Sequence, residues 1–302
     1  MERLKIALLG FALLAAGCGR EATAVAPAER AALLREFREA EPRWQQGKVG
    51  TKLVALNDKS VVPPLLEMLG SQNRKTRCNA GRVLAGLGDD RGLFAVIREL
   101  SDKSHRPIRK DEVRGNGGQA PQVAGDRHYA AQVLREIGDQ RAVPALIQAL
   151  QDVSIIYQAA IVLGHLGDKR AIPPLRKMAR DFPKERLWAG YGLAALGEGE
   201  GLSILSEVAM SDPLWTDRRH AVEALGEFGG SRATPILVKA LKDTHVNVRV
   251  SAARALGRTR DPASLPALTE ALNDAEVTKV HAPTTVASEA RRAIAAMEAH
   301  RK

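Results

Sequence analysis

The stretch Tyr129–Asp152 reads YAAQVLREIGDQRAVPALIQALQD, and its pattern recurs along most of the chain. It contains two short segments with apolar residues at helical spacing, joined at Gly138 and Asp139. With Asp139 as the reference, equivalent positions follow one another at 29 to 32 residues, apart from one gap of 50. They are Asp58, Asp89, Asp139, Asp168, Glu198, Gly230 and Asp261. A period of this length predicts a solenoid of stacked repeats.

The first segment of each repeat has one large and one small apolar position. Leucine stands five residues before the reference in all seven copies: Leu53, Leu84, Leu134, Leu163, Leu193, Leu225 and Leu256. Alanine stands nine residues before it in six copies: Ala80, Ala130, Ala159, Ala189, Ala221 and Ala252, with Val49 in the first. Positions four apart lie on one face of a helix, and alanine lets a neighbouring helix approach closely. The first segment is therefore predicted to be a helix that packs against its neighbours.

The second segment has a wider apolar stripe. Val143, Leu146, Ile147 and Leu150 fall at i, i+3, i+4 and i+7, the spacing of an amphipathic helix. A residue suited to a left-handed helix end precedes the reference in most copies: Gly88, Gly138, Gly167, Gly197 and Gly229, with Asn57 in the first. Proline five residues after the reference fits only a first helical turn, and so marks where the second helix begins: Pro63, Pro144, Pro173, Pro235 and Pro266.

The segment Leu166–Leu175, LGDKRAIPPL, resembles the terminal signature of the HEAT-repeat family, in particular the short class named after bilin-lyase subunits. The resemblance covers roughly residues 43–299. It implies an all-α fold, a right-handed α-α superhelix of about seven helix pairs plus capping helices. It says little about function, because such solenoids host many unrelated roles.

Residues 28–302 are assigned to this solenoid. An N-terminal capping helix is expected to turn Leu33, Leu34 and Phe37 to one side, and residues 288–300 predict a last amphipathic helix. Two insertions interrupt the period, residues 103–126 and the shorter 275–287. The longer one is rich in glycine and proline, so it is predicted to be a surface loop of the kind that often carries function.

The N-terminal residues predict where in the cell the protein is located. Arg3 and Lys5 precede an apolar run that is too short to cross a bilayer but fits a signal-peptide core. The sequence LAAGC that ends at Cys18 resembles a bacterial lipobox, although its leucine lies one place early. Residues 1–17 are therefore predicted to be a lipoprotein signal peptide, Cys18 the lipidated residue and residues 18–27 a tether. Gly19 favours sorting to the outer membrane, facing the periplasm. An ordinary secretory signal or a short membrane-anchored helix stays open as an alternative.

No constellation with a known reaction appears in the sequence. It has no H-E-x-x-H, G-x-S-x-G or phosphate-loop motif, no cysteine pair for zinc and no histidine followed by glutamate. We therefore expect no catalytic residue, no metal site and no cofactor, and a protein that is not an enzyme. Cys78 is interpreted as a partly exposed structural thiol, and His165 and His220 as surface histidines. Trp188 and Trp215 either anchor a partner or fill gaps between repeats.

The net charge of +10 raises the possibility of an acidic partner or nucleic acid. Much of it has a structural explanation, because arginine recurs twelve residues before the reference and aspartate thirteen after it. These residues predict a ladder of ion pairs between repeats: Arg77, Arg127, Arg186, Arg218 and Arg249 with Asp102, Asp152, Asp181, Asp243 and Asp274. The basic segment 169–186 is interpreted as a solvated helix edge, or else as a site for an acidic partner or anionic lipid.

The concave surface of a HEAT fold is expected to be lined by the second helices. The position nine residues after the reference points away from the apolar stripe, and we predict that it binds the partner: Glu67, Arg98, Gln148, Lys177, Glu207, Lys239 and Glu270. The three acidic and three basic residues of this row have no net charge, so the row is not expected to bind the phosphates of a nucleic acid.

Together these features predict a lipid-anchored scaffold that mediates protein–protein interaction in the bacterial cell envelope. We expect an unidentified protein partner at the concave row and the long loop, membrane attachment through Cys18, no nucleic acid and no small-molecule substrate. Two other functions stay open: a bilin-lyase-like enzyme or enzyme subunit, which the repeat class suggests, and a nucleic-acid-binding HEAT protein. The signal peptide speaks against both, because bilin chemistry belongs with cytoplasmic chromoproteins.

Overall fold

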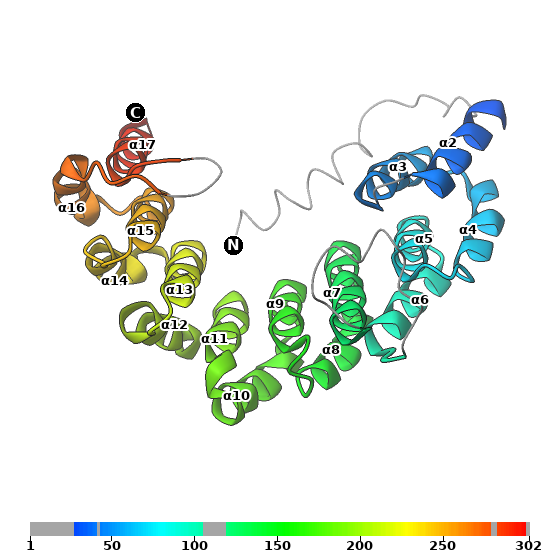
Figure 1. Ribbon diagram of the computed structural model, residues 1–302, viewed down its shortest axis with the longest axis horizontal. Coiled ribbons are helices and arrows are strands. Elements are labelled where there is room, and N and C mark those ends of the chain that lie inside the picture. The colour runs from blue at the N-terminus through cyan, green and yellow to red at the C-terminus, as the bar shows by residue number, and fades with distance from the viewer. Residues whose placement is uncertain (1–26, 41–42, 105–118, 279–282, 300–302) are drawn as a thin grey trace.

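A computed structural model describes residues 27–40, 43–104, 119–278 and 283–299. Its helices form seven consecutive pairs between two flanking helices (Figure 1). The flanking helices are α2 (Pro27–Glu39) and α17 (Val286–Ala299). The pairs are α3 (Arg43–Leu56) with α4 (Val62–Met68), α5 (Arg74–Gly86) with α6 (Asp90–Ser101), α7 (Gln119–Ile137) with α8 (Val143–Ala149), α9 (Ile156–Leu166) with α10 (Ile172–Asp181), α11 (Arg186–Ala195) with α12 (Gly199–Ser211), α13 (Trp215–Phe228) with α14 (Thr234–Ala240), and α15 (Val246–Thr259) with α16 (Leu265–Glu270). The predicted all-α solenoid is confirmed.

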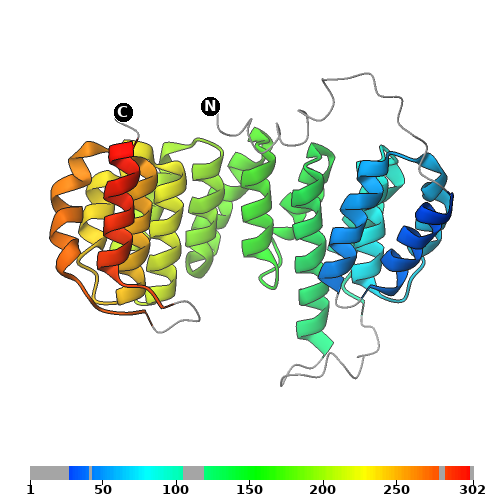
Figure 2. The same cartoon turned by 90° about the horizontal axis from the view of Figure 1, so that it is seen from above.

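The pairs stack side by side into an open arch (Figures 1 and 2). The first helices of the repeats, α3 to α15 in odd numbers, line the inner side of the arch, and the second helices lie on its outer side. This arrangement is the reverse of the one expected from the sequence. The row from Glu67 to Glu270 belongs to the second helices, so its residues lie on the outer side and do not form the concave surface.

Small residues on the first helices explain the direction of the curvature. A Cβ atom placed on Gly226 of α13 would lie 2.5 Å from the Cβ of Ala255 on α15. One placed on Gly164 of α9 would lie 2.9 Å from the Cβ of Ala195 and 3.1 Å from the Cα of Gly192, both on α11. Both glycines face the next first helix, so these helices approach more closely than side chains would allow. Close spacing on one side of a two-layer stack bends the stack toward that side.

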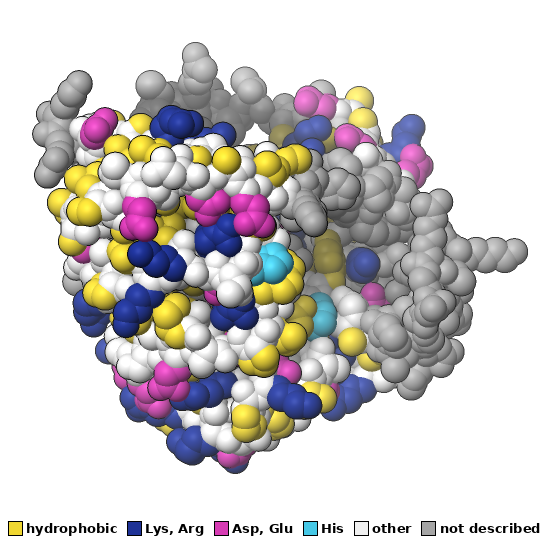
Figure 3. Space-filling view, turned by 60° about the vertical axis from the view of Figure 1, so that its left-hand side comes forward, with side chains coloured by type: hydrophobic (Ala, Val, Ile, Leu, Met, Phe, Trp, Pro, Cys, Tyr) yellow, Lys and Arg dark blue, Asp and Glu magenta, His cyan; other side chains and the backbone are white. Residues whose placement is uncertain are grey.

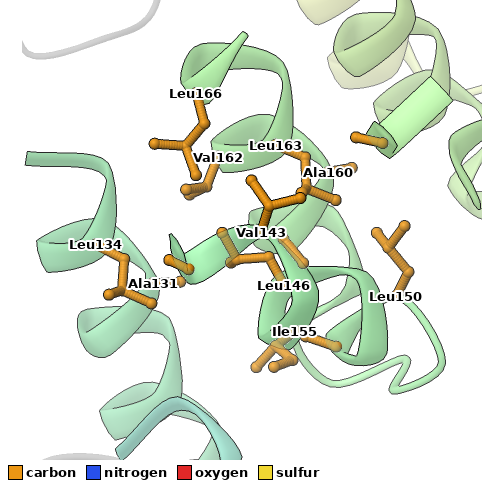
Figure 4. Close-up of a cluster of buried hydrophobic side chains, with 14 of the residues drawn as sticks. Ala131, Leu134, Val143, Leu146, Leu150, Ile155, Ala160, Val162, Leu163 and Leu166 are labelled. Carbon is orange, nitrogen blue, oxygen red and sulfur yellow. The ribbon is translucent and has the colours of Figure 1, made fainter. Parts of the chain in front are cut away.

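The predicted leucine positions form the core. All seven leucines five residues before the reference are at most 1% exposed. In Figure 4, Leu134 and Leu163 from successive first helices point toward Val143 and Leu146 of the intervening second helix. At the ends, Phe37 of α2 is buried, and Ala290, Ala293 and Met297 form the buried face of α17, the amphipathic helix that was predicted. Each repeat therefore buries its apolar face only against its neighbours, as in other solenoids.

The turn within each repeat follows the predicted chemistry. The reference residues Asp58, Asp89, Asp139, Asp168 and Asp261 each cap the following helix, accepting a backbone N–H two residues further on. The residue before the reference has a positive φ in the first five copies, from Asn57 to Gly197. In the sixth, the left-handed residue is Gly230 and not Gly229, because Gly229 keeps a right-handed conformation at the end of α13.

The arginine ladder is confirmed in three repeats. Arg127, Arg218 and Arg249 pair with Asp152, Asp243 and Asp274 at 2.8, 2.7 and 2.7 Å. Each guanidinium also donates to a carbonyl at the end of the preceding repeat: Leu100, Asp212 and Asp243. One side chain thus connects two inter-repeat turns. Arg77 and Arg186 pair instead with Glu99 and Glu207, each at 2.6 Å.

The predicted loop 103–126 is shorter than expected. Residues 105–118 lie outside the described part of the chain, but α7 begins at Gln119, so the last eight residues of the predicted loop are helical. Val123 and Asp126 are buried there, which gives this extension a packed face, and Pro121 falls in its first turn, where proline is tolerated. Within the second insertion, Val277 forms an isolated bridge with Thr285.

The predicted signal peptide, Cys18 and most of the tether also lie outside the described residues. Among the helices that are described, none has the length and apolar character needed to cross a membrane.

Candidate functional site: an aromatic surface on the inner side of the arch

A row of ring side chains crosses four consecutive first helices. His128 of α7 contacts Tyr157 of α9 edge to face, with ring centroids 5.0 Å apart. Tyr157 lies 5.5 Å from Trp188 of α11, and Trp188 lies 5.3 Å from His220 of α13. Contacts of this kind contribute beyond the apolar area that they bury. The row is therefore continuous from repeat three to repeat six.

A second row runs parallel to the first on three of these helices. His165 of α9 stacks on Tyr191 of α11 at 6.0 Å, and Tyr191 contacts Phe228 of α13 edge to face at 5.0 Å. We call the seven residues of both rows the inner aromatic surface: His128, Tyr157, His165, Trp188, Tyr191, His220 and Phe228. Figure 3 shows histidine and hydrophobic side chains bordering the hollow of the arch.

Helical periodicity explains why these rings share one face. His128 and Tyr157 stand eleven residues before their reference positions, and Trp188 and His220 stand ten before theirs. Tyr191 is one turn beyond Trp188, and His165 is two turns beyond Tyr157. His165 is exposed and the other six rings are partly buried. Trp188 packs against both large hydrophobic clusters of the molecule, so one side of its indole is fixed while part of it stays accessible.

Two titratable rings of this surface, His220 and Tyr191, are held in their uncharged forms. Burial, followed by the neighbouring Arg219 guanidinium, lowers the pKa of His220. The same guanidinium lies 2.7 Å from His220 Nε2, which fits a neutral imidazole that accepts there and carries its proton on Nδ1. Burial, then the Glu227 carboxylate, raises the pKa of Tyr191 to about 12. At neutral pH His220 and Tyr191 are therefore uncharged, polarisable rings.

Charged residues flank the rings on the side of α15. Arg219 pairs with Glu223 at 2.8 Å, and Ser251 of α15 donates to the same carboxylate at 3.0 Å. Arg254 follows one turn later on α15 and is 45% exposed. An apolar, ring-lined surface bordered by guanidinium groups suits a flat conjugated molecule that carries acidic substituents.

The residues that the sequence analysis selected do not come together at this site. The whole predicted row is exposed on the outer side, where Lys177 pairs with Asp181, Glu207 with Arg186, and Glu270 with Lys242. These contacts are those of a solvated helix face. Trp215 stacks on His245 at 3.9 Å at the start of α13 and α15 and is not part of the inner aromatic surface. In the basic segment, Arg170 and Arg176 likewise have carboxylate partners.

Cys78 corrects another expectation. It is 1% exposed, and burial raises the pKa of its thiol. Cys78 is therefore not partly exposed: its position varies among the copies, but in this copy it packs into the hydrophobic core. The same variation contained the missed signal, because His128 and Tyr157 occupy it in consecutive copies and Trp188 and His220 follow one place later. Within the described ranges, no group of three or more His, Cys, Asp or Glu side chains is placed to hold a metal ion.

Comparison with known proteins identifies the repeat and one enzyme relative. The model for HEAT repeats matches residues 124–194 and 202–288, more than half of the chain. A stretch of 92 residues is 35% identical to the phycocyanobilin lyase subunit beta of Pseudanabaena tenuis, covering 30% of this chain and 30% of that protein.

Solved structures with a similar fold include a phycocyanin lyase complex from Nostoc sp. PCC7120, with 21% identity and a TM-score of 0.48 over 78% of this chain and 92% of that chain. Human deoxyhypusine hydroxylase has 20% identity and a TM-score of 0.36 over 90% and 96%.

The relative overturns three expectations. From the sequence we expected a scaffold, no enzymatic role and no small-molecule substrate, whereas the matched protein is a phycocyanobilin lyase subunit. The expectation of no enzymatic role rested on the absence of known catalytic motifs, and the scaffold was preferred to a bilin-lyase-like enzyme because of the predicted signal peptide, residues 1–17. Neither argument concerns the surface that the repeats form. The repeats are assigned by sequence and by fold, and the chain belongs to the HEAT-repeat family.

Proposed function

We propose that this chain is an enzyme subunit of the bilin-lyase type, and that its inner aromatic surface holds a linear tetrapyrrole. The continuous ring row from His128 to His220 carries the proposal. The curated relative, a phycocyanobilin lyase subunit, supports the ligand class over the stretch that it matches. That stretch covers only 30% of each chain. The proposed lyase activity is therefore argued from the inner aromatic surface and tested by the experiments below.

The residues of the surface have separate roles in this proposal. Trp188, which packs against the hydrophobic core, and Tyr157, which contacts the rings of His128 and Trp188, offer ring faces against which conjugated pyrrole rings lie. In neutral His220, Nδ1–H is a buried donor that has no hydrogen-bond partner among the described atoms. After a small movement of the imidazole, it can donate to a lactam or carbonyl oxygen of the ligand. The surface positions a chromophore and leaves its other face open, so a second protein can approach from the hollow of the arch.

Binding of phycocyanobilin tests the proposal first. Titration of phycocyanobilin with the purified protein should shift the visible absorption of the chromophore. Trp188→Ala should weaken binding about tenfold, because the stacking of a flat ring, such as a nucleic-acid base, on an aromatic side chain is worth roughly 1–3 kcal/mol. Phe94→Ala is the matched control, since Phe94 is an aromatic residue on the outer helix α6 and is 55% exposed. Equal affinity of all three proteins, or no binding, would contradict the proposal.

The enzymatic step is tested separately. The protein is mixed with phycocyanobilin and with phycocyanin that lacks its chromophore, and covalent transfer is followed by chromophore fluorescence on a denaturing gel. We expect transfer that Trp188→Ala slows and Phe94→Ala leaves unchanged. Binding without any transfer would reduce the proposed role to chromophore holding.

We also propose that the chain is a lipoprotein attached through Cys18 to the outer membrane on its periplasmic side. The apolar run before LAAGC supports this, and more than one acyl chain gives durable attachment where a single chain is marginal. Full-length protein should partition into detergent, and Cys18→Ser should release it or leave the precursor uncleaved. A wild-type protein found wholly in the aqueous phase would exclude the anchor and leave both the binding and the transfer proposals for the repeats in place. Attachment on the periplasmic side would leave tetrapyrrole binding in place but exclude transfer to a cytoplasmic chromoprotein.

A further inference from the structure

The inner side of the arch carries a surplus of positive charge beyond the end of the ring row. Arg254 of α15 and Arg292 of α17 share one carboxylate, that of Glu289, at 3.3 and 2.8 Å. Glu289 is 7% exposed, while the two arginine side chains are 45% and 74% exposed. Two guanidinium groups around one carboxylate leave one positive charge without compensation.

The two arginines keep most of their hydrogen-bonding capacity. Arg254 reaches Glu289 only through contacts of 3.3 and 3.5 Å, and Arg292 makes one contact of 2.8 Å. A guanidinium has five N–H donors in a planar fork that matches a carboxylate. Arg258, exposed four residues after Arg254, lies on the same face of α15 and adds to the positive potential.

A chain of contacts connects the arginines to the inner aromatic surface. His220 touches Arg219, which pairs with Glu223, and Glu223 accepts from Ser251 of α15. Arg254 follows Ser251 by one helical turn, about 5 Å along the axis. The Glu223 carboxylate is neutralised inside this network. Glu227, an exposed acid of α13, acts on Tyr191 of α11, so one negative charge lies beside the rings, one first helix before the α15 that carries Arg254.

We infer that Arg254 and Arg292 form a carboxylate-binding site for the ligand whose rings lie on the inner aromatic surface. This inference rests on the proposed function and names the part of the ligand that the arginines take: the propionate groups of a linear tetrapyrrole. Stacking on aromatic side chains accepts many flat ligand rings and so selects little among them. A pair of guanidinium groups selects for a ligand with an anionic substituent, and it fixes which end of that ligand faces α15. Glu289 holds the two arginines in place and competes with the ligand for their donors.

Phycocyanobilin and its dimethyl ester distinguish this inference from the proposed function. They share the conjugated system, but the ester lacks the carboxylates. The unchanged protein should bind the acid at least about tenfold more tightly than the ester, and added salt should reduce the difference. Trp188→Ala should weaken both ligands to a similar extent.

Two variants address the arginines without leaving a buried charge unpaired. The triple variant Arg254→Gln, Glu289→Gln, Arg292→Gln removes the site, and its preference for the acid should fall to about twofold or less. Glu289→Gln alone removes the carboxylate that competes with the ligand for the arginines, so it should increase the preference for the acid over the ester. A purely structural role of Glu289 would not produce this increase. Arg98→Gln, an exposed arginine of the outer helix α6, is the control and should match the unchanged protein.

Each outcome decides a different point. Equal binding of acid and ester by the unchanged protein, or full preference for the acid in the triple variant, overturns the arginine site while the aromatic site stands. Failure of both ligands to bind overturns the proposed function and this inference together.

Discussion

At the scale of single residues, the core positions were predictable and the functional ones were not. Leucine at a fixed offset in every copy can only be buried, because one helical face must pack in each repeat. The rings of the first row, from His128 to His220, occupy the offsets eleven and ten before the reference, where each copy has a different residue. A pattern shared by all copies identifies the core, whereas Trp188 and His220 become meaningful only when neighbouring helices bring them to 5.3 Å.

His220 gives a prediction at this scale. Its pKa is lowered first by burial and then by Arg219, so below about pH 6.5 the unfolded chain binds a proton that the folded chain does not. This group therefore costs stability as the pH falls from about 6.5 to the folded pKa, and costs nothing above that window. Arg219→Gln should raise the His220 midpoint in an NMR titration without restoring the ordinary value, because burial persists.

The matched control for this titration is Arg232→Gln, which removes an exposed arginine from the turn before α14. His220 should titrate there as in the unchanged protein. An identical midpoint in Arg219→Gln and the control would exclude the proximity effect of Arg219.

At the scale of helices and turns, the sequence predicted the helix pairs and three of the five ion pairs between repeats. Asp139 caps the short 3-10 helix Gln140–Ala142 that leads into α8, and Pro144 lies in the first turn of α8, because both effects are local. The start of α7 was missed, since glycine and proline before Asp126 suggest a loop while the burial of Val123 supports a helix. Tertiary contacts overrode local propensity there.

Arg218 gives a prediction for the turns. It forms a two-point ion pair with Asp243 at 2.7 and 2.8 Å and donates to the Asp212 carbonyl, with both charged side chains at most 13% exposed. Arg218→Ala should lower the free energy of unfolding by about 1.5–3 kcal/mol, the range for hydrogen bonds to charged groups. Arg232→Ala, at an exposed site, should change it by less than about 0.5 kcal/mol.

Hydrogen exchange should locate the loss from Arg218→Ala in the turn between repeats six and seven, because each repeat contacts only its neighbours. Burial alone would raise the pKa of Asp243, but hydrogen bonds from Arg218 and the His245 N–H outweigh it and hold the pKa below its usual range. The pair therefore stabilises the fold above about pH 4 and is lost as the pH falls through the lowered pKa. A uniform loss of protection along the chain would contradict this local role.

At the scale of the whole molecule, the period predicted a solenoid but not which helices line its hollow. A repeating sequence can be divided before either helix, so the period alone cannot say which layer lies inside. The sizes of the contact residues decide it: glycine and alanine between first helices shorten the inner layer, and the arch bends toward them. That geometry brings the ring side chains of four repeats onto one surface.

Gly226 therefore controls the curvature. In Gly226→Ala the new Cβ would start 2.5 Å from the Cβ of Ala255, and carbon atoms prefer about 3.5–4.0 Å, so α13 and α15 must separate by about 1 Å. Overpacking of this kind costs about 1–3 kcal/mol, which exceeds the gain of up to about 1 kcal/mol from replacing glycine by alanine in a helix. The separation widens only the inner layer, so the arch opens and the radius of gyration measured by small-angle X-ray scattering rises. Gly199→Ala is the control, because no atom lies within 4 Å of its Cβ position. Unchanged scattering and unchanged stability in Gly226→Ala would mean that the inner helices do not set the curvature.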